Sequence, residues 1–322
     1  MPRLFSALAR VGALSAAVLL PGLPAGAAPY SEIYVFGDSL VDAGNISLIQ
    51  PGITPASVGY YDGRLSNGPL YTDLLYQASY GTYRTPSLQG GTNYAFGNAR
   101  AVDNSGFSSG ADAIPDLGAQ VDMYAVRAGG MADPDALYLI NVTANDVLAL
   151  MEGSTNGMSP AAYAGAVAAE MAAQIERLDD MGARHILVTG VPNADIPEAF
   201  LLQAVLDEAI SGLELESELM LYSFLDLFTR ILADPASVGL PPDLDTTTPC
   251  IVGETPSPDI DCTGYFLFDA THPSAAIHEV IAREVARLAG IAPVNGQVRE
   301  PAVLALIGFG LVATALARRR RA

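Results

Sequence analysis

The stretch Ile33-Tyr34-Val35-Phe36-Gly37-Asp38-Ser39-Leu40-Val41-Asp42-Ala43-Gly44-Asn45 carries the most information in this chain. Its first four residues form a short apolar run, which predicts a buried strand. A serine therefore stands where that strand ends, next to Gly37. A serine on a tight turn exposes its hydroxyl, and the backbone N–H groups around it are free to hold an oxyanion. The stretch thus predicts a nucleophile at Ser39.

Two polar residues follow the serine within the same stretch. Asp42 is expected to cap the helix that begins after it, because Asp accepts hydrogen bonds from the free N–H groups of a first turn. Asn45 is expected to hold the turn around Ser39 through bonds between its side chain and the backbone. Both residues are therefore predicted to have structural roles.

The composition indicates a globular protein. The chain has 322 residues, of which 50% are hydrophobic and only 16% are charged, so one large domain with processed ends is expected. The formal net charge is -19, and every cationic side chain is an arginine. Four of these arginines lie at Arg318–Arg321, so the body of the chain is more acidic than the total suggests. Such a body is repelled by nucleic acid and by anionic lipid, which favours a neutral ester or glycan as its ligand.

The N-terminus has the pattern of an export signal. Residues 1–28 contain Arg3 and Arg10, then the apolar segment 11–20, then a run rich in Pro, Gly and Ala. This order predicts a secretory signal peptide that signal peptidase removes. Cleavage is expected near Ala27 or Ala28.

The C-terminus has the pattern of a sorting signal. After a linker over 293–300, the segment 301–322 begins with Pro301, continues through the uncharged residues 302–317 and ends in the arginine cluster. Sixteen helical residues span about 24 Å, slightly less than the roughly 30 Å of a bilayer core. The tail is similar to the PEP-CTERM sorting signal of Gram-negative bacteria, with Arg299 in place of the first proline. The resemblance implies transient membrane association through 302–317 and processing by an exosortase-type enzyme, with a plain membrane anchor as the alternative.

The two cysteines fit an exported protein. Cys250 and Cys262 lie in a region, 240–264, that is rich in Pro, Asp and Thr. No second cysteine pair or histidine cluster accompanies them, so a disulfide is favoured over a metal site.

Strand-like and helix-like segments alternate along the chain. The expected strands lie at 33–36, 136–141, 185–189 and 219–226, with a short apolar run at 265–268; the expected helices lie at 68–78, 116–128, 160–181, 197–213, 227–232 and 274–289. Apolar strands that alternate with helices predict a three-layer α/β/α fold with a mostly parallel central sheet. Ligands bind at the carboxyl ends of such strands. Ser39, the segment 141–146 and the segment 269–272 all fall there.

The chain contains three histidines, and one of them is placed to act as a base. His185 opens a strand and is expected to be structural, and His278 is expected to be exposed on the last helix. His272 follows an apolar run and precedes a helix, and Asp269 stands three residues before it. A carboxylate at that spacing can orient the imidazole from the same turn.

These segments resemble a known family. Over residues 31–290 the chain resembles GDSL-type esterases/lipases of the SGNH hydrolase superfamily, which implies a flavodoxin-like domain, here over 29–292. The matching blocks are Gly37-Asp38-Ser39-Leu40, Asp62-Gly63-Arg64-Leu65-Ser66-Asn67-Gly68-Pro69, Gly90-Gly91-Thr92-Asn93-Tyr94-Ala95-Phe96-Gly97, Thr143-Ala144-Asn145-Asp146 and Asp269-Ala270-Thr271-His272-Pro273.

The resemblance implies a role for each matched residue. Ser39 is the nucleophile, His272 the base and Asp269 the orienting carboxylate. The oxyanion donors are the backbone N–H groups of Ser39 and Gly97 and the side-chain amide of Asn145. Neither a metal nor a cofactor is implied.

The sequence departs from the family pattern at two positions and leaves one block open. Thr143 stands where the family usually has Gly, which is costly if that position has a positive φ. Asn98 stands where a second Gly is common, and Asn tolerates positive φ better. Arg64 and Asn67 are expected either to line the cleft or to hold its loops together.

The leading hypothesis is an exported serine ester hydrolase that acts on a lipid or an acylated glycan. It is expected in the periplasm, at the cell surface or in the extracellular matrix of a Gram-negative bacterium. One alternative on the same fold is acyl transfer from phospholipid to another acceptor. Another is a catalytically silent glycan-binding protein of the cell envelope.

Overall fold

The computed structural model describes residues 29–102, 114–194 and 196–292. The predicted signal peptide over 1–28, the linker over 293–300 and the sorting tail over 301–322 lie outside this part of the chain. Within it, every helix is too short or too polar to cross a membrane.

A parallel sheet forms the centre of the fold. Its strands β1 (Ile33–Gly37), β2 (Leu137–Asn141), β3 (His185–Thr189) and β4 (Glu218–Tyr222) pair in the order β1-β2-β3-β4. All three pairings are parallel. The segment 92–96 runs along the other edge of β1, where Val35 N–H donates to Thr92 O at 3.1 Å and Tyr94 N–H donates to Val35 O at 2.7 Å. With this segment counted, the order is the 2-1-3-4-5 of flavodoxin-like folds.

Nine α-helices and three short 3-10 helices connect these strands in the described residues. They are α1 (Asn45–Ile49), η1 (Ala56–Val58), α2 (Tyr71–Tyr80), η2 (Ser87–Gln89), α3 (Leu117–Ala128), α4 (Ala144–Glu152), α5 (Pro160–Asp180), α6 (Pro197–Ser211), α7 (Phe224–Ala233), η4 (Pro235–Val238), α8 (Cys250–Gly253) and α9 (Ala275–Leu288).

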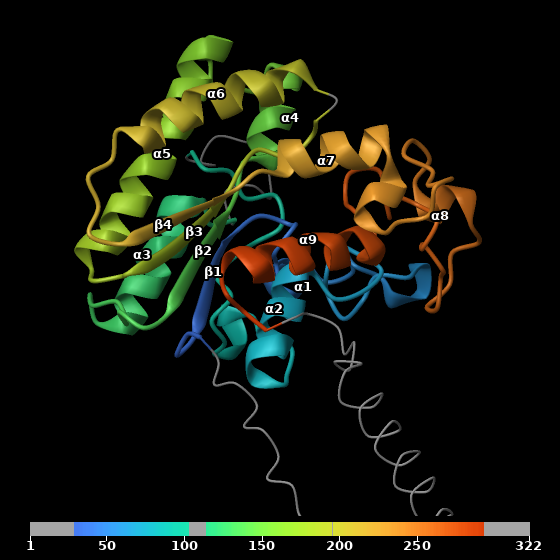
Figure 1. Cartoon of the computed structure of the whole chain (residues 1–322), viewed down its shortest axis with the longest axis horizontal. Helices are drawn as coiled ribbons and strands as arrows, with labels where there is room; N and C mark the ends of the chain where they lie inside the picture. The colour runs from blue at the N-terminus through green and yellow to red at the C-terminus, as the bar shows by residue number, and fades with distance from the viewer. Residues whose placement is uncertain (1–28, 103–113, 195, 293–322) are drawn as a thin grey trace, which may run out of the picture.

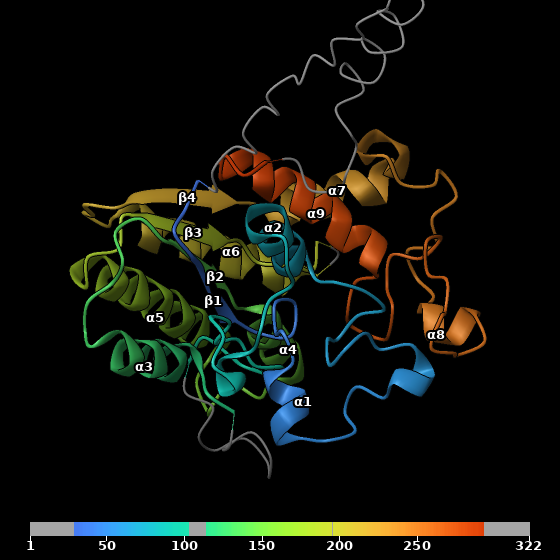
Figure 2. The same ribbon diagram turned by 90° about the horizontal axis from the view of Figure 1, so that it is seen from below.

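Helices cover both faces of the sheet, as Figures 1 and 2 show. One core contains buried residues of α3, α4, α5 and α6 packed on Phe36, Tyr138 and Ile186. The other contains buried residues of α2, α7 and α9 packed on Val35 and Leu139. Because alternate residues of a strand point to opposite faces, the continuous apolar strands serve both cores. The predicted three-layer α/β/α architecture is confirmed.

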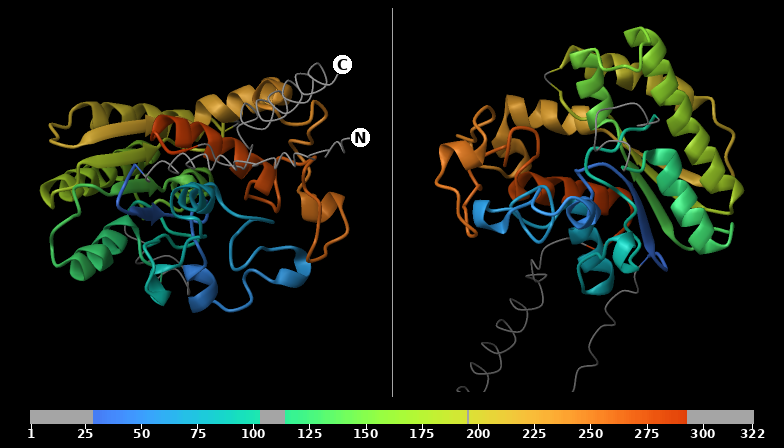
Figure 3. Two further views of the ribbon diagram at one scale, coloured as in Figure 1. Left: turned by 60° about the horizontal axis from the view of Figure 1, so that its bottom comes forward. Right: turned by 180° about the vertical axis from the view of Figure 1, so that it is seen from behind.

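The loops that carry η1 and α8 lie side by side, away from the sheet (Figure 3). Ile260 lies against Gly59, and the ring of Tyr60 packs edge-on against Phe268 with centroids 4.8 Å apart. This subassembly supports the loop that contains Asp269 and His272.

The expected elements differ from the observed ones at the run 265–268, at α4 and at the short helix α8, for which no element was expected. The apolar run 265–268 forms isolated bridges rather than a strand, because its partners are the loop residues Asp245 and Pro273. Helix α4 was not among the expected helices. Its first turn contains Asn145, whose block was interpreted only as a site motif. The other boundaries agree to within a few residues.

Candidate active site

Ser39 lies on a sharp turn after β1 that only glycine permits. A Cβ on Gly37 would overlap the carbonyl oxygen of Asn141 on the neighbouring strand. Gln120 of α3 holds the same glycine from the other side, because its Oε1 accepts from Gly37 N–H at 2.7 Å and its Nε2 donates to Gly37 O at 2.9 Å. Only 7% of the surface of Ser39 is exposed, so a substrate reaches it through a pocket rather than from open solvent.

Two buried carboxyl groups hold the turn. Asp38 accepts from the N–H of Leu40 at 3.0 Å and from the N–H of Ala144 at 3.3 Å, which joins the serine turn to the start of α4. Asp42 accepts from the N–H groups of Gly44, Asn45 and Ile46, so its predicted capping role is confirmed. Burial raises the pKa of Asp38 to about 7 and that of Asp42 to about 6.

Asn45 holds a more distant part of the chain than expected. Its Nδ2 donates to the carbonyl oxygens of Asn93 at 2.8 Å and Ala95 at 2.9 Å, and its Oδ1 accepts from Leu88 N–H at 3.1 Å. It therefore ties the segment after the serine turn to the chain at the edge of β1.

Asp269 and His272 form a closely bonded pair. His272 Nδ1 lies 2.8 Å from each oxygen of Asp269. Asp269 Oδ1 also accepts from His272 N–H, and Oδ2 accepts from the hydroxyl of Tyr60 at 2.8 Å. Burial alone would raise the pKa of Asp269, but its hydrogen bond to His272, the charge of that ring and two backbone N–H groups lower it to about 2. Asp269 is therefore an anion at neutral pH, with an imidazole N–H as its partner.

The block at 62–69 braces the histidine loop. Ser66 Oγ donates to Pro273 O at 3.0 Å, Asn67 Oδ1 accepts from Ala275 N–H at 2.8 Å, and a Cβ on Gly68 would lie 2.7 Å from the Cβ of Ala275. Arg64 is buried and pairs with Asp73 at 3.0 Å. Arg64 and Asn67 were expected either to line the cleft or to hold its loops together. The structure supports the second role, because neither residue lines the pocket.

Ser39 and His272 open onto one pocket of about 380 Å³. Its polar lining residues are Ser39, Asn98, Asn145, Asn193, Thr246, Thr271 and His272; its apolar ones include Leu148, Ile196, Phe228, Leu232, Phe266 and Leu267. The pocket lies at the carboxyl ends of the strands, where parallel α/β folds bind ligands. Ser39 and His272 do not hydrogen bond to each other in this structure, and such bonds commonly form only when substrate binds.

One predicted oxyanion donor needs correction. The N–H of Gly97 donates to the buried Oδ2 of Asp42 at 2.8 Å, so it is not available to a substrate, and Gly97 does not line the pocket. The next residue, Asn98, does line it, with φ +66°. The left-handed backbone turns at Asn98, and its N–H has no acceptor among the described residues. Asn98 therefore replaces Gly97 as the candidate donor.

The side chain of Asn145 is held at the pocket by a backbone carbonyl group. Its Nδ2 donates to Ala99 O at 2.8 Å. Because a side-chain amide carries two N–H groups, one remains for a substrate oxygen. The backbone N–H of Ser39 likewise has no acceptor among the described residues.

Thr143 precedes this donor in a strained conformation. Its φ is +126° and its ψ is -16°, so the position does require the positive φ that disfavours a β-branched residue. Its Oγ1 is buried and has no hydrogen-bond partner in the described part of the chain. Both features cost free energy.

We expect Thr143→Gly to raise the free energy of unfolding by about 1 kcal/mol or more, because glycine removes the strain and the unpaired hydroxyl. Thr143→Ala removes the hydroxyl and the γ-methyl group but keeps a Cβ at the positive φ, so it should be less stable than Thr143→Gly. At positions with negative φ, a glycine variant is usually less stable than the alanine variant. A higher free energy of unfolding for Thr143→Gly than for Thr143→Ala, measured by chemical denaturation, would therefore report the backbone strain. An alanine variant more stable than the glycine variant would contradict this explanation.

The other two histidines lie outside the pocket. His185 is partly buried, packs against Tyr30 with ring centroids 5.3 Å apart and lies 3.4 Å from Glu218, which agrees with a structural role. The prediction that His278 is exposed was wrong. It lies on the buried face of α9 with Ile281 and Val285, its Nδ1 accepts from Tyr71 N–H at 3.3 Å, and burial lowers its pKa to about 3. In the described part of the chain, no cluster of three or more His, Cys, Asp or Glu side chains could hold a metal ion.

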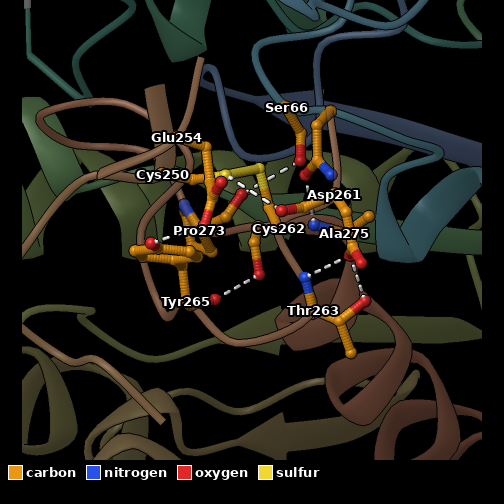
Figure 4. The surroundings of a disulfide bond; sticks show 11 residues. Ser66, Cys250, Glu254, Asp261, Cys262, Thr263, Tyr265, Pro273 and Ala275 are labelled. Carbon is orange, nitrogen blue, oxygen red and sulfur yellow. Dashed lines mark hydrogen bonds between the residues drawn. A yellow bond between two sulfur atoms is a disulfide. The ribbon is translucent and has the colours of Figure 1, made fainter. Parts of the chain in front are cut away.

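The predicted disulfide between Cys250 and Cys262 is present and is shown with its surroundings in Figure 4. Both cysteines are buried in a small core with Ile260 and Phe268. Asp269 follows Phe268 directly, so the bridged loop supports the segment that contains Asp269 and His272.

A nearly buried serine at the end of the first strand, an Asp–His pair and a shared pocket on a parallel α/β/α fold are the parts that a serine hydrolase of the flavodoxin-like type requires. The model of the GDSL-like Lipase/Acylhydrolase family matches residues 33–285. The chain belongs to that family.

Several proteins are similar to this chain. A phosphatidylcholine-sterol acyltransferase of Aeromonas hydrophila is 26% identical over 70% of this chain and 66% of its own length. An uncharacterized protein from the trpE-trpG intergenic region of Pseudomonas putida is 28% identical over 79% of this chain and 48% of its own. A GDSL esterase/lipase of Arabidopsis thaliana is 28% identical over 49% of this chain and 51% of its own length. The chain thus spans about half to two thirds of the length of these relatives.

Among solved structures, the acetylxylan esterase Axe2 of Geobacillus stearothermophilus aligns with a TM-score of 0.43 and 14% identity, over 84% of this chain and 99% of that one.

Proposed function

We propose that the protein is a serine ester hydrolase that cleaves carboxylic esters through an acyl-enzyme. The observation that carries this proposal is the Asp269–His272 pair, bonded at 2.8 Å, whose histidine opens with Ser39 and Asn145 onto one pocket. The domain that performs the reaction extends over 29–292.

The proposed reaction follows from these positions. Ser39 Oγ attacks the ester carbonyl while His272 Nε2 takes its proton, and Asp269 stabilises the imidazolium that forms. The intermediate collapses, His272 returns the proton to the leaving alcohol, and the acyl group remains on Ser39. Water then repeats the sequence and releases the acid.

Three donors are proposed to hold the developing oxyanion. They are the backbone N–H groups of Ser39 and Asn98 and the side-chain amide of Asn145. Each such donor contributes about 3 kcal/mol to the lowering of the barrier.

The pocket supports an apolar acyl group. Leu148 of α4, Phe228 and Leu232 of α7, and Phe266 and Leu267 contribute apolar surface to a space of about 380 Å³. A chain of several methylene groups gains about 0.8 kcal/mol for each one that it buries. We therefore expect butyryl esters to be cleaved with a higher kcat/KM than acetyl esters.

The test combines turnover with covalent labelling. The purified protein should release p-nitrophenol from p-nitrophenyl butyrate, and a fluorophosphonate should abolish that release while adding one adduct. Peptide mass spectrometry should place the adduct on Ser39, and excess substrate should slow its formation. Turnover that survives labelling of Ser39, or a protein that neither turns over esters nor reacts, would rule the proposal out. The second of these results would favour a silent glycan-binding protein.

Acyl transfer is a second candidate because of the similarity to the phosphatidylcholine-sterol acyltransferase. In this case an alcohol rather than water would attack the acyl-enzyme. Product analysis with phosphatidylcholine and an alcohol acceptor, compared with water alone, separates the two. Acylated alcohol in excess of free acid would favour transfer.

We also propose that the protein is exported. The pattern of residues 1–28 and the disulfide support this location, since disulfides persist in oxidising compartments. Processing of 301–322 by an exosortase-type enzyme remains part of the same proposal. Mass spectrometry of the protein isolated from its native host should find both ends removed.

A further inference from the structure

Asn193 lines the pocket but has no assigned role in the proposed chemistry. It follows β3 and shares the pocket with Ser39, Asn145 and His272. Its Oδ1 is buried and has no hydrogen-bond partner among the described residues. An unpaired buried acceptor is destabilising, so a ligand in the pocket that donates a hydrogen bond to this side chain would supply the missing partner.

The backbone at Asn193 is also unusual. Its φ is +72°, in the left-handed region, and its carbonyl accepts from Ile196 N–H at 3.0 Å to close a turn. Asn adopts this conformation more readily than most residues other than glycine, and residues with positive φ often stand at ligand sites. The turn holds the amide at the pocket wall, between Pro192 and Ala194, which also line it.

The chemistry of an amide restricts the ligand. Asn193 offers one acceptor and two N–H donors side by side, and rotation about its Cβ–Cγ bond presents either to the pocket. A hydroxyl both donates and accepts, so neighbouring hydroxyl groups match this side chain. The apolar residues that α4 and α7 contribute to the pocket are suited to the acyl chain, and the pocket also has polar lining residues, Asn193 and Thr246 among them, that can bind the alcohol part of the ester.

We propose that Asn193 binds a hydroxyl group on the alcohol part of the substrate, so that the preferred substrates are partial esters of polyols. This proposal rests on the ester hydrolase proposed above. Glycerol and sugars both provide the required hydroxyl beside the ester, and the experiment treats them as separate arms.

The experiment measures a ratio of kcat/KM values for the full-length protein. Glycerol monobutyrate and 6-O-butyryl glucose are each compared with propyl butyrate, which has the same acyl group and no free hydroxyl. The wild-type ratio should exceed about tenfold for at least one polyol ester, because a polar site discriminates against an analogue that lacks the bonding group. The arm with the larger ratio identifies the polyol.

Two substitutions test the residue itself. Asn193→Gly removes the amide, keeps the positive φ and should lower the ratio about tenfold or more. Asn193→Asp keeps an acceptor and should retain most of the preference. Asn156→Gly is the matched control, since Asn156 also has a positive φ, is exposed and lies outside the pocket. Its ratio should equal that of the wild type.

The outcomes separate this proposal from the one on which it rests. Equal kcat/KM for polyol and propyl esters in the wild type, or an unchanged ratio in Asn193→Gly, overturns the role of Asn193 while hydrolysis stands. A wild-type protein that cleaves none of the three esters overturns the hydrolase and the recognition together.

Discussion

The Asp269→Asn variant should hydrolyse esters about 10⁴-fold more slowly than the wild type, a loss close to that of Ser39→Ala. Asp269 accepts hydrogen bonds from the imidazole, from two backbone N–H groups and from the hydroxyl of Tyr60. An amide in its place puts N–H groups where the site requires acceptors. It also removes the negative charge that stabilises the imidazolium of His272. The measurement is kcat for p-nitrophenyl butyrate at neutral pH.

Two comparisons make this prediction specific. The double variant Ser39→Ala with Asp269→Asn should be no slower than Ser39→Ala alone, because the three groups act as one unit. Asp261→Asn is the matched control, since Asp261 lies in the neighbouring loop and accepts from Thr263 in a similar turn but lies outside the pocket. Activity of Asp269→Asn within tenfold of the wild type would remove Asp269 from the proposed mechanism.

Gly37→Ala should cost the protein more than about 3 kcal/mol in the free energy of unfolding, or prevent folding altogether. The added Cβ would overlap the carbonyl oxygen of Asn141 and lie 2.7 Å from the side chain of Val41. Neither contact can relax easily, because one is backbone of a central strand and the other belongs to the serine turn. The loss is measured by chemical denaturation, or by the fraction of soluble protein.

Gly165→Ala provides the opposite case. This glycine lies inside α5 and has open space around its missing Cβ. Alanine should therefore stabilise the protein by about 0.5–1 kcal/mol. If Gly37→Ala were as stable as Gly165→Ala, the close approach of β1 and β2 would not explain the glycine before Ser39.

Much of the site could be predicted because Ser39 and Asn145 follow strands, and parallel strands bring their carboxyl ends to one edge. His272 follows the apolar run 265–268, which forms isolated bridges rather than a strand. Asp269 could be paired with His272 because both lie in one loop. These inferences need only local patterns and the general geometry of parallel sheets.

Other parts depended on contacts that no local pattern shows. Gly97 and Asn98 are adjacent, and only the distant carboxyl of Asp42 decides which N–H is consumed. Tyr60 reaches Asp269 across 209 residues of sequence. Asn193 gave no sequence signal beyond its place after a strand. The prediction for His278 failed because the buried face of α9 is wide and includes this histidine together with the apolar residues around it.

The sequence by itself determined the layered α/β fold, the disulfide, and the serine, histidine and carboxylate of the proposed reaction. These depend on periodicity and on residue chemistry over short spacings. Only the tertiary structure decided which backbone N–H groups remain free for an oxyanion, that Thr143 is strained, and that the block at 62–69 braces the histidine loop. Hydrogen bonds between segments distant in sequence decide these points, because a buried donor is satisfied by whichever acceptor the fold brings to it.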